Sequence, residues 1–202
     1  MKLSKTVKNA SVAFLFISSF YLISCNSTTN RDSSKDSVAM VTNKMDTSRA
    51  VFTNVHAEAM LSGTVADTSL EGKAIFDVVD SKVKMSLDIL VPKMANKSVA
   101  VHIHEHGACG DMGKDAHGHW NPTNQQHGKW GEGSFHLGDI GNVTLDANGK
   151  GHMDLETNLW TLGGDSTSNI MGRAIIVHGG MDDFKTQPTG NAGSRIGCGV
   201  IQ

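Results

Sequence analysis

Short runs in which apolar and polar side chains alternate constrain the fold of this chain most strongly. In residues 83–89 every second side chain is apolar and those between are Lys, Ser or Asp, and residues 99–103 and 152–156 repeat the alternation. A period of two places successive side chains on opposite faces of a strand, so that one face can be buried. From residue 51 onward the pattern therefore predicts β-strands.

Five shorter stretches bring the expected number of strands to about eight. They are residues 57–61, 74–79, 140–145, 174–178 and 197–202, with glycine and asparagine between them and no sustained helical period. Short strands separated by turn residues indicate an all-β sandwich or barrel. Two connections, residues 105–139 and 179–196, are long. Long connections in a compact domain are usually functional or disordered, and the residues here favour function.

The first 25 residues differ from the rest of the chain. Three lysines lie within the first eight residues, and an apolar stretch, residues 10–23, leads to Leu22-Ile23-Ser24-Cys25. The stretch is short and interrupted by serine, which indicates an export signal rather than a membrane span. Its end resembles the lipobox of bacterial lipoproteins, in which the cysteine is lipidated and becomes the first mature residue. The alternatives are an ordinary secretory signal or an uncleaved anchor, with Cys25 incidental.

The next segment, residues 26–50, is rich in Ser, Thr, Asn, Asp and Lys and has few large apolar side chains. Such a composition cannot bury enough surface to offset its ordering entropy, so we expect a flexible tether. As a coil it would span roughly 25–30 Å. Residues 51–202 then have an ordinary length for one domain with a single core.

The charge of the exported part excludes one class of partner. Once the three lysines of residues 1–25 are subtracted from the 18 basic side chains, 15 basic side chains face 20 acidic ones, a net charge of −5. A mildly acidic protein has no general affinity for nucleic acid. An anionic substrate would therefore have to be attracted by a local group of charges.

The chain contains three cysteines, Cys25, Cys109 and Cys198. If Cys25 carries a lipid, the other two can form one disulfide in an oxidising exported setting. In the chain-entropy model, a disulfide that closes a loop of about 90 residues raises the free energy of unfolding by roughly 4–5 kcal/mol, although strain usually reduces this gain. The alternative is two free thiols.

The placement of the ten histidines suggests a metal site. His102 and His104 flank Ile103 on a predicted strand, so both imidazoles project from one face while Ile103 points to the other. Imidazole is a suitable ligand for copper and for zinc. Further candidate ligands follow in the two long connections and at the end of residues 174–178: His106, His117, His119, His127, His136, Asp139, His178, Asp182 and Asp183.

Five motifs, in this order, resemble the copper/zinc superoxide dismutase family. They are His102-x-His104, His119-Trp120-Asn121-Pro122, His136-x-Gly138-Asp139, Gly172-Arg173-Ala174-x-x-Val177-His178 and the ending from Gly190 to Val200. Each motif alone is a weak signal, whereas the whole set in family order is very specific. The resemblance extends from about residue 57 to the C-terminus. It implies an eight-stranded Greek-key β-sandwich or barrel that converts superoxide to dioxygen and hydrogen peroxide.

The resemblance also implies a ligand set, with one copper and one zinc ion per subunit. Copper would be held by His102, His104, His119 and His178. Zinc would be held by His119, His127, His136 and Asp139, a donor set that suits a closed four-coordinate zinc site. His119 would bridge the redox-cycling copper to the structural zinc and carry a proton during turnover.

Three further features match the family. Asp182 matches the carboxylate that connects a copper-ligand histidine to a zinc-ligand histidine. Arg195 matches the active-site arginine, which attracts and orients the anionic substrate. Cys109 and Cys198 match its intrachain disulfide. The resemblance is compatible with a homodimer as well as with a monomer, and the lipobox places the protein in the bacterial cell envelope, on the periplasmic side or at the cell surface.

Some residues depart from the family pattern. His56, His106, His117 and His152 match no ligand position and are expected at the surface, and Asp183 is expected in a turn. Ala100 and Val101 stand where the family commonly has glycine and an aromatic residue, and residues 185–188 are short where many relatives carry a longer charged segment.

Two alternatives are a non-enzymatic copper-binding or copper-delivery lipoprotein and a structural domain that binds only zinc. The full set of predicted copper ligands, together with Arg195, argues against both.

Overall fold

The structure is a computed structural model and describes residues 56–202. The predicted signal segment, residues 1–25, and the predicted tether, residues 26–50, lie outside the described residues. No helix among residues 56–202 has both the length and the apolar character needed to cross a membrane.

The described residues form eight strands and two short 3₁₀ helices, η1 (Pro92–Met94) and η2 (Asp111–Ala116). The strands are β1 (His56–Gly63), β2 (Glu71–Val79), β3 (Lys82–Leu90), β4 (Ser98–His104), β5 (Gly141–Thr144), β6 (Lys150–Thr157), β7 (Ala174–His178) and β8 (Arg195–Val200). The predicted all-β fold is confirmed.

Most strand boundaries differ from the prediction by one to three residues, and two of the differences have a clear cause in the pairing. β2 begins three residues earlier than predicted, because Glu71 already pairs with Leu90 of β3. β8 is shifted toward the N-terminus, because Arg195 pairs with His178 beyond a bulge in β7. The last residue, Gln202, instead exchanges backbone hydrogen bonds with Glu58 near the start of β1.

The strands pair antiparallel in the order β5-β4-β7-β8-β1-β2-β3-β6. β3 and β4 follow each other in the chain but are not neighbours in the sheet, and the same holds for β6 and β7. Such connections between strands that are not adjacent are typical of a Greek key. The two ends of the sheet, β5 and β6, meet closely: a Cβ added to Gly151 would lie 2.5 Å from Val143 Cγ1. The sheet is therefore a nearly closed barrel.

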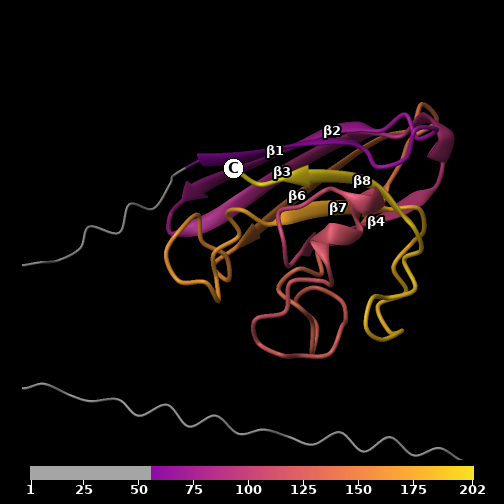
Figure 1. The fold of residues 1–202 in the computed structure, drawn as a ribbon. Helices are drawn as coiled ribbons and strands as arrows, with labels where there is room; N and C mark the ends of the chain where they lie inside the picture. Colours follow the sequence, from indigo (N-terminus) through magenta and orange to yellow (C-terminus); the bar gives the residue numbers. More distant parts are fainter. Residues whose placement is uncertain (1–55) are drawn as a thin grey trace, which may run out of the picture. The chain divides into compact units, whose positions relative to one another are not determined.

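The inner faces of the strands form the core, in which Phe76, Met85, Leu87, Ile103 and Ile175 are fully buried. β4 and β7 are buried on their outer faces as well. Figure 1 shows both long connections leaving the barrel on the side of β4 and β7. Ala116 in the first connection packs against Ile176 on the outer face of β7, so this loop shields part of that face.

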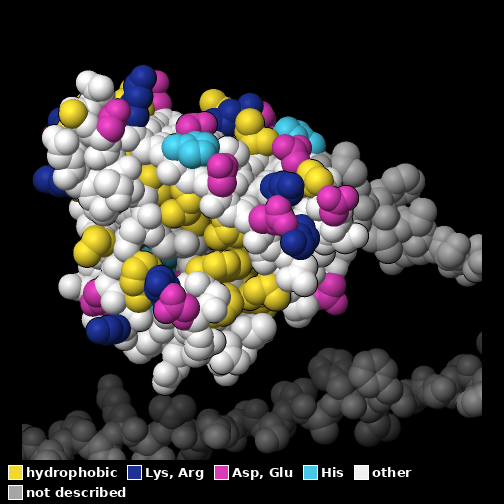
Figure 2. Space-filling model, turned by 180° about the vertical axis from the view of Figure 1, so that it is seen from behind, with side chains coloured by type: hydrophobic (Ala, Val, Ile, Leu, Met, Phe, Trp, Pro, Cys, Tyr) yellow, Lys and Arg dark blue, Asp and Glu magenta, His cyan; other side chains and the backbone are white. Residues whose placement is uncertain are grey.

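Seen from behind the view of Figure 1, the molecule carries acidic and basic side chains intermingled around a hollow with hydrophobic side chains (Figure 2). Eleven residues line a cavity of about 620 Å³, including Met60, Ile89 and Leu90. Since neither sign of charge dominates this face, it offers no large basic patch for a polyanion.

Candidate metal centre

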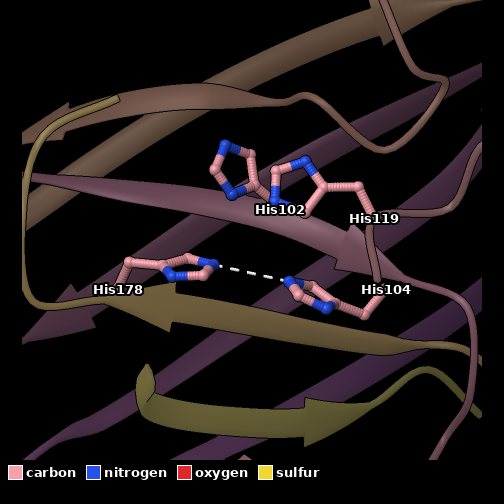
Figure 3. A group of neighbouring side chains, drawn as sticks. All are labelled: His102, His104, His119 and His178. Atoms are coloured by element: carbon pink, nitrogen blue, oxygen red, sulfur yellow. Dashed lines mark hydrogen bonds between the residues drawn. The ribbon is translucent and has the colours of Figure 1, made fainter. Parts of the chain in front are cut away.

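A first group of buried side chains lies on the outer face of β4 and consists of His102, His104, His119 and His178. One ring nitrogen from each lies within 4.8 Å of the corresponding nitrogens of the others. Figure 3 shows the four rings turned toward a common space, with 3.4 Å between the Nε2 atoms of His104 and His178.

Strand pairing explains this convergence. β4 pairs with β7 so that His104 lies opposite Ala174 and Val101 opposite Val177, which brings His178 at the end of β7 toward the same face. The chain then returns along β4, where Trp120 N–H donates to Ile103 O and places His119 opposite His104.

A second buried group consists of His119, His127, His136 and Asp139, whose ligand atoms also lie within 4.8 Å of one another. The Asp139 carboxylate is 2.8 Å from His119 Nδ1, 3.0 Å from His127 Nδ1 and 3.3 Å from His136 Nδ1. His119 therefore belongs to both groups. Its Nδ1 faces Asp139, which leaves Nε2 for the first group.

Four nitrogens in these groups are buried without a hydrogen-bond partner: His102 Nδ1, His119 Nε2, His127 Nδ1 and His136 Nδ1. The two Nδ1 atoms of His127 and His136 lie near Asp139, but their geometry does not make a hydrogen bond. A buried polar atom left unpaired costs about 1–3 kcal/mol. Two of the four belong to each group, so the donor sets fit a metal ion in each.

Asp182 connects the two groups. Its Oδ2 is 2.8 Å from His102 Nε2 and its Oδ1 is 2.9 Å from His127 Nε2. An ionised carboxylate only accepts, so each Nε2 carries the proton and donates it. The lone pair of each ring is then on Nδ1, the atom that points into its group.

Backbone carbonyls orient two more rings in the opposite sense. His104 Nδ1 donates to His117 O at 2.8 Å, and His178 Nδ1 donates to Gly193 O at 3.3 Å. Both rings therefore present Nε2 to the first group.

Burial and charge determine the protonation of these rings. Burial lowers the pKa of His178 to about 3. It also lowers the pKa of His119 to about 4, although Asp139 opposes this. Burial disfavours a charged His127 as well, but the adjoining carboxylates of Asp139 and Asp182 outweigh it and raise the pKa of His127 to about 9. A metal ion in the second group would therefore replace a proton on His127.

Three residues that the sequence reasoning missed hold this arrangement. Asn142 accepts a hydrogen bond from Asp182 N–H at 2.8 Å and donates one to Asp182 O at 2.9 Å. Gln187 does the same for His127, accepting from its N–H and donating to its O, both at 2.9 Å. Gly190 lies so close that a Cβ there would be 1.8 Å from Asp182 Oδ1. No local sequence signal indicates these contacts.

Arg195 begins β8, beside His178 in the strand register. Its guanidinium donates to Gly113 O and His117 O in the loop that contains η2. Cys109 of the same loop is joined to Cys198 of β8 by a disulfide. The loop that orients Arg195 is therefore covalently attached to the strand that carries it.

The remaining candidates lie outside the two groups. Asp183 accepts hydrogen bonds from Lys185 N–H and Thr186 N–H, as expected of a turn residue. The four other histidines, His56, His106, His117 and His152, are exposed.

Residues 62–201 match the family model described as copper/zinc superoxide dismutase (SODC). The chain belongs to the copper/zinc superoxide dismutase family.

Two related superoxide dismutases align with most of this chain. The Cu-Zn superoxide dismutase of Paramecium bursaria Chlorella virus 1 is 38% identical over 170 residues, which cover 81% of this chain and 87% of the relative. That of Schizosaccharomyces pombe is 34% identical over 154 residues, covering 73% of this chain and 97% of the relative. The crystal structure of the clock protein EA4 aligns with a TM-score of 0.65 and 33% identity, covering 74% of this chain and 94% of that one.

As a copper/zinc superoxide dismutase, the protein is an enzyme that dismutates superoxide with copper and zinc as cofactors. The two buried donor sets fit these metals, since imidazole suits both and a carboxylate completes the second set. The alternative of a copper-delivery protein without turnover is not favoured.

Proposed function

We propose that copper is held by His102 Nδ1 and by the Nε2 atoms of His104, His119 and His178. Zinc is held by the Nδ1 atoms of His119, His127 and His136 and by the Asp139 carboxylate. The observation that carries this assignment is His119, which belongs to both groups, with Nδ1 on Asp139 and Nε2 buried and unpaired.

Copper, when bound, supplies the one-electron chemistry by which one superoxide is oxidised to dioxygen and a second is reduced to hydrogen peroxide. While His119 Nε2 is not a copper ligand, it can hold a proton and deliver it, since its Nδ1 remains engaged in the zinc group. Asp182 keeps His102 and His127 in the tautomer that presents Nδ1.

Arg195 attracts and orients the superoxide anion. Two of its terminal nitrogens each donate one hydrogen bond to a backbone carbonyl, which leaves three of its five N–H groups for the substrate. It lines a cavity of about 290 Å³ together with Gly193 and Lys114, whose ammonium group is 3.4 Å from the Asp111 carboxylate. Residues 26–202 carry a net negative charge, so an anion has to be attracted by a local positive charge such as that of Arg195.

The test is the rate of superoxide dismutation by the purified protein loaded with copper and zinc, with zinc alone as control. His178→Ala removes a copper ligand that takes no part in the zinc group. We expect loss of activity with one zinc still bound per chain by metal analysis. Full activity in this variant would refute the copper assignment.

We further propose that residues 1–25 direct export and that a lipid on Cys25 anchors the enzyme to the bacterial cell envelope, at the periplasmic side or the cell surface. The lipobox-like Leu22-Ile23-Ser24-Cys25 and the polar residues 26–50 support this proposal. The Cys109–Cys198 disulfide is compatible with an oxidising compartment.

Replacement of the lipidated residue tests the anchor. Cys25→Ser should move the enzyme from the membrane fraction to the soluble fraction with unchanged specific activity. Retention in the membrane fraction would contradict lipidation at this residue. The soluble variant also allows analytical ultracentrifugation to distinguish a monomer from a homodimer.

A further inference from the structure

Three exposed side chains outside the copper and zinc groups form a third cluster, which consists of Glu105, His106 and His117. One ligand atom from each lies within 4.8 Å of the others. The two imidazole rings have centroids 4.4 Å apart and an interplanar angle of 84°. Among residues 56–202 it is the one group of this kind besides the two buried ones.

The backbone brings the two histidines together. His104 pairs with His119, and two hydrogen bonds continue the contact beyond this pair: Glu105 N–H donates to Gly118 O at 3.0 Å and His106 N–H donates to Ala116 O at 3.1 Å. The second bond passes over His117, whose φ of 61° and ψ of −144° turn the backbone away from a strand conformation. The two bonds hold the segments side by side, and the centroid distance of 4.4 Å places both imidazoles within reach of one ion.

The cluster is also held in place before any ion binds. Glu105 O accepts a hydrogen bond from Arg173 at 3.0 Å. His117 O accepts from both His104 and Arg195, and His117 N–H donates to Lys114 O. A ligand set on a fixed backbone loses little conformational entropy on binding.

Two arginines lie near this cluster: Arg195, which donates to His117 O, and Arg173. Arg173 is the one beside Glu105. Its three hydrogen bonds go to the backbone carbonyls of Glu105, Ser166 and Asn169, and its guanidinium stacks 4.3 Å from the centre of the Trp120 ring. The carboxylate of Glu105 therefore keeps its charge available to the cluster.

We propose that Glu105, His106 and His117 form a third, solvent-exposed metal site that takes Cu(II). Two imidazoles and one carboxylate suit this ion, and water can fill its open positions. Among divalent first-row metals a nitrogen and oxygen site of this kind binds Cu(II) most tightly. The site lies beyond the end of β4 and shares no residue with the copper group, so it is separate from that group.

The test is a calorimetric titration of the full-length protein, already holding one copper and one zinc, with Cu(II) ions. We expect one additional copper per chain and a second Cu(II) signal by electron paramagnetic resonance. His106→Gln and Glu105→Gln should each weaken this extra binding by at least about tenfold, as loss of a ligand contact does. His117→Asn is a further variant, because it removes the imidazole and keeps a polar side chain at a position where φ is 61°.

His56→Gln is the matched control, since it also removes one exposed imidazole but lies on β1 away from the cluster. It should retain the extra copper. Absence of an additional copper in the unmodified protein would overturn the proposal, and so would equally tight binding in His106→Gln. Dismutation is measured separately on the same samples. Failure of the third site would remove the extra copper, whereas failure of the buried copper assignment would show in the dismutation rate.

Discussion

Replacing Gly190 with alanine should disrupt both metal groups at once. The new Cβ would lie 1.8 Å from Asp182 Oδ1 and 2.6 Å from His127 Nε2, distances at which the atoms must move apart. Asp182 cannot turn away freely, because its carboxylate also contacts His102 and accepts from Phe184 N–H. The carboxylate must therefore give up a contact that holds a metal ligand.

The magnitude follows from two costs. Gly190 has a φ of 65°, and an L-residue in this left-handed region costs about 1–2 kcal/mol. Loss of one hydrogen bond to a charged group costs roughly 1.5–3 kcal/mol more. The free energy of unfolding should therefore fall by about 3–5 kcal/mol. Zinc affinity should fall by about 10–100-fold, because the partner that orients His127 is displaced.

Urea unfolding of the metal-free protein and competition with a zinc chelator measure the two effects. Gly131→Ala is the control, since Gly131 has a φ of 75° but a Cβ there meets no atom within 4 Å. It should lose about 1–2 kcal/mol of stability from the backbone alone and keep its zinc affinity. If Gly190→Ala behaves like Gly131→Ala, Asp182 does not hold the metal ligands as we have argued.

Two further predictions concern the loop around Arg195. Arg195→Ala should slow dismutation and weaken its dependence on ionic strength, because the substitution removes a local positive charge. Metal content should stay unchanged, because Arg195 is not a metal ligand. Stopped-flow kinetics at several salt concentrations measure the effect, and an unchanged rate would refute the steering role. Cys109→Ser combined with Cys198→Ser should lower the free energy of unfolding by about 2–5 kcal/mol in urea. This double variant should also slow dismutation, since the loop whose carbonyls accept hydrogen bonds from Arg195 is no longer attached to β8. Full activity in the double variant would show that the hydrogen bonds alone position Arg195.

The sequence predicted the strands because alternation is a local property of the chain. The period of two in residues 83–89 needs only the pleat of a strand, and β3 forms there with Val83, Met85, Leu87 and Ile89 buried. The same reasoning placed His102 and His104 on one face of β4. It could not show that this outer face is buried, because His119 and Asp182, which lie against His102, come from the two long connections.

The order of the histidine motifs indicated the family and hence the expected ligands, which is information carried by residue identity and spacing alone. The orientation of those ligands depends on contacts between residues far apart in the chain. His102 and Asp182 are separated by 80 positions, and His127 and Gln187 by 60.

Such contacts exist only after the barrel closes and both long connections fold back on β4 and β7. The sequence by itself thus determined the strands, the family and the identity of the candidate ligands. The tertiary structure decided which ring nitrogen each ligand presents, why Gly190 must lack a side chain, and that the His106 ring lies against the His117 ring. The physical reason is that pairing across the sheet and loop, rather than spacing along the chain, sets these distances.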